Sequence, residues 1–229
     1  MRILRRLASL EWPHLILEVV LIFVGITGAL WFDNLKQARE ERRLERSILQ
    51  ELATALTSDT TDLHFNLRSS TRTLASIDTV LTYLQERRPY DPSLADHFRS
   101  ASSATNFLVN SAAYEDLKSV GLGTISNDTL RIRIAQYYEV QVAYLTKVES
   151  LFVNGNWSDV VRPQMLEKFH YRFLFEPAVP LNYRALYGDV RFQTALETMR
   201  ETIKWKASLS RRTIRDAEWL LESISGTSS

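Results

Sequence analysis

One stretch near the start of the chain constrains its fold more than any other. From Leu15 to Phe32 the sequence reads LILEVVLIFVGITGALWF, about eighteen residues whose only charged side chain is Glu18. Trp12 and Trp31 stand near the two ends of this stretch. On a helix that rises 1.5 Å per residue they would lie roughly 28 Å apart, close to the thickness of a bilayer's hydrocarbon core. We therefore predict a single membrane-spanning helix over residues 15–32.

Two other interpretations of this stretch are open. A basic N-terminal tail followed by an apolar run is also typical of a cleaved signal peptide. Against cleavage, Glu18 interrupts the apolar run early, and the small residues near Thr27–Ala29 are followed by bulky side chains. The other alternative is a buried core helix. The interpretation that we adopt is an uncleaved anchor, preceded by a basic tail over residues 1–14.

Basic residues flank both ends of the predicted span, so two rules for its orientation give opposite results. The acids Asp33, Glu40, Glu41 and Glu45 are interleaved with the basic residues beyond the span. A count of Lys and Arg alone favours a cytoplasmic C-terminal domain. A short basic tail ahead of a signal-anchor-like segment favours the reverse. We expect the N-terminus in the cytoplasm and the C-terminal domain outside it.

Two features inside the span are candidates for more than lipid contact. Gly25, Gly28 and Ala29 leave one helix face smooth enough for a second helix to approach, which suggests self-association or another membrane protein as partner. Glu18 is an ionisable group within the span, and it lies one turn after His14. Its carboxylate is either paired with His14 or directed towards the membrane–water interface, since an unpaired charge in hydrocarbon is costly.

Composition excludes several classes of protein. The chain of 229 residues has no Cys, which removes disulfide frameworks, thiol catalysis and Cys-ligated metal sites. Its formal net charge of +1 gives no electrostatic reason to bind nucleic acid. With seven Gly and six Pro, turn-rich β-sandwiches and phosphate-binding loops are also disfavoured. Long helices are the remaining default.

The apolar spacing beyond the span predicts an all-α fold, in which the transmembrane helix continues into a long amphipathic helix within an antiparallel bundle. The bundle domain is expected over residues 33–225, followed by a polar tail over 226–229. No strand is expected, since the apolar run Tyr171–Phe175 would lack a partner. The expected helices cover Asp33 to about Arg88, about Asp91 to Thr105, Asn110–Val120 ended by Gly121, a long helix capped by Asn127 or Asp128, Trp157–His170 after a break at Asn154–Asn156, and Asp189–Ile224.

The long helix after Asn127 has an apolar seam with heptad-like spacing. The seam consists of Leu130, Ile134, Tyr137, Gln141, Tyr144, Val148 and Leu151. Gln141 is its one polar member. The seam of the last helix consists of Phe192, Leu196, Met199, Ile203, Ala207, Ser210, Ile214, Ala217, Leu221 and Ile224.

Two stretches resemble a known bacterial family. The span carries Glu18, Val24-Gly25-Ile26, Ala29-Leu30 and Asn34. Further along stand Ala113-Tyr114-Glu115-Asp116-Leu117-Lys118-Ser119, Gly121, Ile125, Asn127, Leu130-Arg131 and Tyr137-Tyr138. Both resemble the bacterial family called domain of unknown function 6090, although Leu35 stands where that family usually has Trp. The resemblance implies a single-pass protein of the bacterial inner membrane, and it implies no catalytic role.

No set of residues indicates an enzyme, a metal site or a cofactor. The four His fall in separate segments, and no known catalytic motif is present. Glu167 and His170 match only half of a di-iron site, and we expect Asp59, Asp62 and His64 to be solvated. An enzyme would require His97 or His170 to meet two carboxylates.

The most notable polar cluster is Tyr114, Glu115, Lys118 and Gly121. It is either a partner surface or a structural corner, and we favour the corner. The leading hypothesis for the whole chain is a membrane-anchored helical interaction or scaffold protein. The alternative is a single-span sensor, in which a small ligand binds near four aromatic residues and shifts the continuous helix. These residues are Tyr137, Tyr138, Tyr144 and Trp157.

Overall fold

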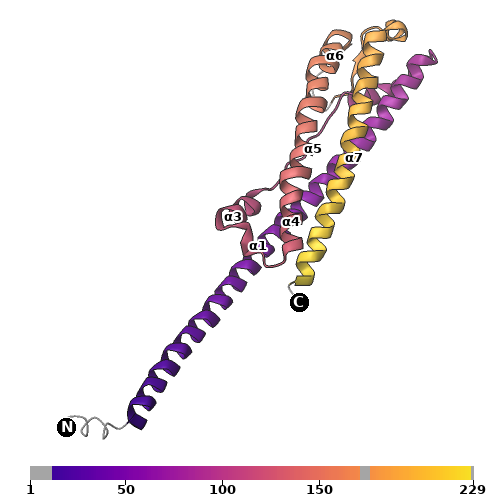
Figure 1. Cartoon of the computed structure of the whole chain (residues 1–229). Helices are drawn as coiled ribbons and strands as arrows, with labels where there is room; N and C mark the ends of the chain where they lie inside the picture. Colours follow the sequence, from indigo (N-terminus) through magenta and orange to yellow (C-terminus); the bar gives the residue numbers. More distant parts are fainter. Residues whose placement is uncertain (1–11, 171–175, 228–229) are drawn as a thin grey trace, which may run out of the picture. The chain divides into compact units, whose positions relative to one another are not determined.

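A computed structural model describes residues 12–170 and 176–227, and it describes side chains from Ile16 onwards (Figure 1). Most of the expected basic tail and the run Tyr171–Phe175 lie outside the described residues. The described part is all-α except for one pair of two-residue strands, so the predicted fold class is confirmed. The longer helices are α1 (Trp12–Gln85), α2 (Leu94–Ala101), α3 (Ala112–Val120), α4 (Asp128–Gln136), α5 (Ala143–Val148), α6 (Arg162–Lys168) and α7 (Val190–Thr227).

The chain divides into two compact units, Met1–Ser47 and Ile48–Ser229. In the first unit, every described side chain of the stretch 16–32 is exposed, and so are most of those in 33–47. The first buried residue of α1 is Ile48, at 6% exposure. The bundle therefore begins about fifteen residues later than the sequence predicts, because the mixed-charge stretch 33–47 has no apolar seam to bury.

Helix α1 continues without interruption through its Thr-rich middle. The stretch Thr57–Asp62, rich in Ser, Thr and Asp, is helical throughout. The hydroxyl groups of Thr57, Thr60 and Thr61 each donate to the backbone carbonyl four residues earlier, over 2.6–2.9 Å. Each hydroxyl shares a carbonyl that the helix ladder also uses, so it is satisfied without an interruption of the helix.

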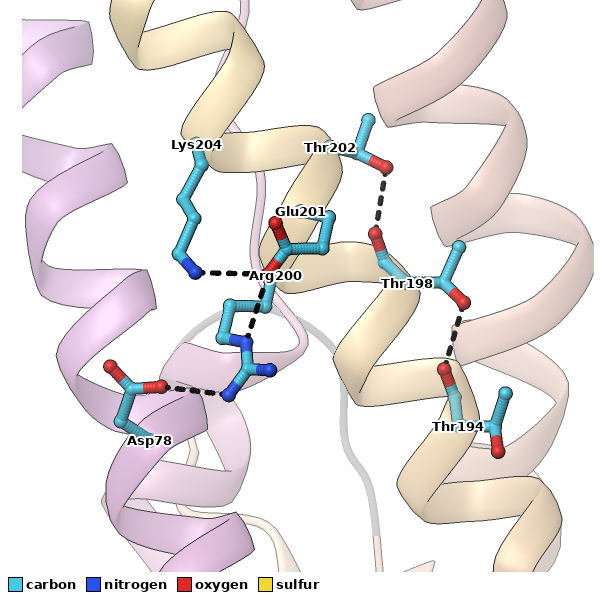
Figure 2. Close-up of polar contacts among 7 residues, drawn as sticks. All are labelled: Asp78, Thr194, Thr198, Arg200, Glu201, Thr202 and Lys204. Atoms are coloured by element: carbon cyan, nitrogen blue, oxygen red, sulfur yellow. Dashed lines mark hydrogen bonds and ion pairs between the residues drawn. The ribbon is translucent and has the colours of Figure 1, made fainter.

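Within the second unit, α7 runs antiparallel to α1. His64 lies opposite Glu218, with 3.6 Å between Nε2 and Oε1, and Asp78 lies opposite Arg200, with 3.3 Å between Oδ1 and Nη1. Arg200 also contacts Glu201, which pairs with Lys204 (Figure 2). These pairs are exposed and contribute little stability each, but they establish the direction of packing.

The second rod of the bundle is one helical path from α4 to α6 with three π-helical turns. These are η2 (Tyr137–Val142), η3 (Glu149–Asn154) and η4 (Trp157–Val161). The path passes through Asn154–Asn156 in helical conformation, so the predicted break there is wrong. Pro163 stands within this path, where η4 passes into α6, and the chain keeps its helical conformation on both sides of it.

The π-helical turns also correct the predicted seam of this rod. Tyr144 is 47% exposed and Leu151 58% exposed, although the heptad spacing placed both in the core. A π-helical turn closes from residue i to i+5, which rotates every later side chain around the axis. The core instead receives Tyr138, Val142 and Leu145. The predicted seam of α7 is confirmed, since all of its members except the half-buried Leu221 are buried.

Within the second unit, the rod from α4 to α6 runs parallel to α1, because the connection between them returns the chain from the C-terminal end of α1 to the opposite end of this unit (Figure 1). This connection contains α2, an extended segment, α3 and a 3-10 turn, η1 (Leu122–Thr124). Helix α3 ends where Gly121 takes a φ of 111°, and the Asn127 side chain accepts from Leu130 N over 3.0 Å to cap α4, both as predicted.

A short irregular hairpin joins the second rod to α7. Its strands are β1 (Phe169–His170) and β2 (Val179–Pro180), paired antiparallel, and they were not predicted. They are followed by a 3-10 helix, η5 (Tyr183–Gly188). Asp189 then caps α7 by accepting from Phe192 N over 2.9 Å. Helix α7 extends to Thr227, two residues into the expected polar tail, of which residues 228 and 229 lie outside the described part.

Candidate functional site

The core of the second unit is made of two apolar clusters. One contains Leu52, Leu63 and Tyr114, and the other contains Ile77, Phe98 and Phe192. Between Leu63 and Ile77 the buried positions of α1 carry polar side chains instead. The buried polar residues near this level, which we call the polar layer, are Asn66, Ser70, Thr73, Glu149, Lys206 and Ser210. Polar groups in a core must be hydrogen-bonded to be tolerated, so their partners show what the layer holds.

The main partner of the polar layer is the extended segment between α2 and α3. We call residues 102–110 the crossing segment. It forms neither helix nor strand, so its backbone groups need partners from elsewhere. Side chains of the surrounding helices supply them: Trp157 Nε1 donates to Ser102 O over 2.6 Å, and Thr73 Oγ1 donates to Ser103 O over 3.5 Å. The crossing segment thus lies against the bundle through side-chain bonds.

A buried ion pair forms the centre of this arrangement. Lys206 Nζ lies 3.0 Å from Glu149 Oε1, and both side chains are almost completely buried, at 2% and 3% exposure. Lys206 also donates to the carbonyl oxygen of Thr105. Both carboxylate oxygens of Glu149 accept from Phe107 N, over 3.1 and 2.9 Å. One pair of charges therefore joins α7, η3 and the crossing segment.

Two carboxylates of α1 hold the next part of the crossing segment. Asp62 Oδ2 accepts from Leu108 N over 2.9 Å, and Asp59 Oδ1 accepts from Asn110 N over 2.7 Å. Asp59 is completely buried and Asp62 is half-buried, so the prediction that both are solvated is wrong. The helical pattern of α1 could not show this, because the partner is an irregular segment more than forty residues away.

Burial dominates the electrostatics of Asp59. It raises the pKa of this carboxyl to about 6, with a smaller contribution from the charge of Asp62, while the bond from Asn110 N opposes the rise. The nearby Tyr137 side chain also acts to lower the pKa of Asp59. Among the described residues, however, neither the Tyr137 hydroxyl nor Asp59 Oδ2 makes a well-formed hydrogen bond. The ionised form of Asp59 is therefore held at a cost.

This cost predicts that Asp59→Asn stabilises the protein at neutral pH. The folded pKa of about 6 lies above the ordinary value of 3.8, so the unfolded chain ionises first and stability falls as pH rises from about 4 to 6. Asn keeps the acceptor for Asn110 N and carries no charge. We expect the free energy of unfolding at pH 7.5 to rise by about 1–3 kcal/mol, and the gain to vanish near pH 4.

Urea unfolding of the full chain in mild detergent at both pH values measures this gain. Asp59→Ala is the comparison, since it leaves Asn110 N without an acceptor and should be destabilising by about 1–3 kcal/mol. A loss of stability in Asp59→Asn as large as that in Asp59→Ala would contradict the account, as would a gain that is equal at pH 4 and pH 7.5.

The predicted corner around Tyr114 is built mainly from internal contacts. The Tyr114 hydroxyl donates to Glu139 Oε1 over 2.8 Å, and its ring stacks on Tyr138 with centroids 4.5 Å apart. Lys118 Nζ lies 2.9 Å from Glu115 Oε2 and 5.1 Å from the centroid of the Tyr114 ring. With Gly121 ending α3, the corner favours the structural interpretation over a partner surface. Glu115 and Lys118 remain exposed.

The candidate residues of the span lie on an open helix. A Cβ atom added to Gly25 or Gly28 would meet no atom within 4 Å, and Ala29 is exposed. Glu18 is also exposed. Its suggested contact with His14 lies outside the described side chains. The smooth face is thus available for another helix.

The four aromatic residues of the sensor hypothesis are separated in space. Tyr137 and Tyr138 are buried in the first apolar cluster, and Trp157 packs against the second. Tyr144 contacts Trp205 at the surface, with ring centroids 6.2 Å apart. They do not form the single aromatic site that the hypothesis expected.

No group of three or more His, Asp or Glu side chains suited to a metal ion is present among the described residues. His97 Nδ1 lies 3.3 Å from Ser76 Oγ, while His170 is exposed on β1. The structure therefore does not bring either His together with two carboxylates as an enzyme would require.

Glu149 and Lys206 were not predicted as site residues from the sequence. Lys206 stands three residues after Ile203 and four before Ser210, which is the spacing of the buried face of α7, and this is the signal that could have found it.

Comparisons with protein-family models, with curated proteins and with solved structures find no match for the chain.

Proposed function

We propose that the chain is a membrane-anchored, all-helical interaction or scaffold protein without catalytic activity, held in a bacterial inner membrane by one span. Support for the anchor comes from α1, which is long and apolar enough to cross a membrane. Its most apolar window has a mean hydropathy of 2.0, and none of that window is buried by the rest of the chain. Such an exposed apolar surface is costly in water and favourable in a bilayer. The C-terminal unit is proposed to lie outside the cytoplasm.

The observation that supports an interaction function is an exposed aromatic patch on the second unit. It consists of Tyr144, Phe152 and Trp205, which are 47%, 48% and 38% exposed. The ring centroids of Phe152 and Trp205 lie 5.1 Å apart, so the patch is continuous across η3 and α7. Exposed clusters of Tyr, Trp and Phe are typical of the central contacts of protein interfaces. We propose that a second copy of this chain binds here.

Photo-crosslinking in membranes tests this proposal. A benzoylphenylalanine placed at Phe152 is expected to form an adduct of twice the chain mass, because the patch lies at the interface. Phe65 is the matched control, since it is 54% exposed and belongs to α1, outside the patch. An adduct with a different membrane protein would overturn self-association and support the scaffold function. Equal, low yields at Phe152 and Phe65 would contradict the interaction function.

A second candidate function is a sensor that binds a small ligand in a surface cavity of the bundle. The observation that favours it is a cavity of about 110 Å³ between α4, η2 and α7, in a different place from the aromatic site expected from the sequence. The test is whether ligand binding changes the crosslinking yield at Phe152. If saturating ligand does not change the crosslinking yield at Phe152, the sensor function is contradicted and the scaffold function remains.

A further inference from the structure

We infer that the cavity between α4, η2 and α7 is a binding site for a small monocarboxylate. At about 110 Å³ it is large enough for a few non-hydrogen atoms. It opens to the surface, since Arg133, Gln136, Arg212 and Trp219 of its lining are exposed. This ligand class specifies the cavity of the sensor candidate and rests on that candidate only for its biological role, because binding itself is tested independently of the interaction function.

Two guanidinium groups define the charge of the cavity. Arg133 of α4 and Arg212 of α7 both line it. Within the described part of the chain, neither makes an ion pair with a carboxylate. The Arg133 guanidinium is instead held over the Trp219 ring, 5.2 Å from its centroid. Guanidinium groups match carboxylates in shape and bind them through paired hydrogen bonds.

The net charge of the residues that line the cavity favours a ligand with a single negative charge. Asp216 also lines the cavity, so its two Arg and one Asp give a formal charge of +1. A carboxylate neutralises this charge, whereas a phosphate dianion would bring excess negative charge next to Asp216. Leu220 and Trp219 supply an apolar wall for a short hydrocarbon tail. Propionate has both a carboxylate and a short hydrocarbon tail, and it has few enough atoms to fit the cavity.

The cavity also accounts for the polar residue in the seam of the second rod. Gln141 interrupts the apolar spacing, and it lines the cavity with Gln136. Two side-chain amides can donate to a carboxylate or accept from a bound hydroxyl group. Both belong to the region where α4 passes into the π-helical turn η2, and π-helical turns are frequent at functional sites.

Fluorine NMR of the full chain in detergent micelles tests the inference. The chain has five Trp, and Trp219 labelled with 5-fluorotryptophan is assigned through Trp219→Phe. Sodium propionate is titrated at constant ionic strength against sodium chloride, with propionamide as the uncharged isostere and sodium phosphate as the dianion. We expect the Trp219 resonance to shift saturably with propionate, with a dissociation constant of about 1 mM or below.

Matched Arg variants show whether the site is the one inferred. Arg212→Gln should weaken propionate binding at least about tenfold, and propionamide should bind at least about tenfold more weakly than propionate. Arg211→Gln removes the same charge from a neighbouring exposed position that does not line the cavity, and it should change the affinity less than about twofold. A non-saturable shift, equal effects of both Arg variants, or tighter binding of phosphate would overturn the inference.

Discussion

Lys206→Met is expected to lower the free energy of unfolding by about 3–5 kcal/mol, the usual cost of removing one partner from a buried ion pair. Lys206 and Glu149 are almost completely buried, and Lys206 also bonds the Thr105 carbonyl. Met fills a similar volume, so the loss comes from the uncompensated carboxylate and not from a cavity. Urea unfolding followed by Trp fluorescence measures it.

Two further variants isolate the cause of this loss. Lys204→Met removes an exposed Lys that pairs with Glu201 over 2.9 Å (Figure 2), and it should change stability by less than about 0.5 kcal/mol. The double variant Lys206→Met/Glu149→Gln keeps an acceptor for Phe107 N without a buried charge. It should be more stable than Lys206→Met alone. Equal effects of the two Lys variants, or a double variant no more stable than Lys206→Met, would refute the account of the polar layer.

Val24→Arg should release much of the protein from the membrane. Val24 lies near the middle of the apolar stretch, where Arg costs about 2.5–3.5 kcal/mol in insertion, equivalent to about 100-fold in the insertion equilibrium. Phe65→Arg places the same charge on an exposed apolar site of the second unit, where it should be tolerated. Alkaline extraction followed by immunoblotting measures the membrane-bound fraction of each variant. Equal membrane retention of Val24→Arg and the wild type would contradict a single span.

The all-α class and several helix ends could be predicted from local chemistry. Asn127 and Gly121 act within one turn of their own positions, as an N-cap and as a residue of positive φ. The apolar face of α7 was also predictable, because a regular helix keeps its 3.6-residue period over its whole length.

The side chains that hold the crossing segment could not be predicted, because their partners are distant in sequence and irregular in conformation. Asp59 and Glu149 bind backbone groups of the crossing segment, which no periodic pattern marks. The exposure of Tyr144 depends on a π-helical turn that changes the period itself. Both errors arise from the assumption that every helix is regular and that every buried position is apolar.

Single-cysteine labelling is the most direct test of the central claim, that residues 15–32 span the membrane and the C-terminal unit lies outside the cytoplasm. The chain has no Cys, so each introduced Cys is the only target. In intact spheroplasts, an impermeant maleimide should label Ser208→Cys, an exposed position of α7, and should leave Val24→Cys unlabelled. Labelling of Ser208→Cys only after lysis would contradict the proposed side of the membrane, and labelling of Val24→Cys as readily as Ser208→Cys would contradict the span itself.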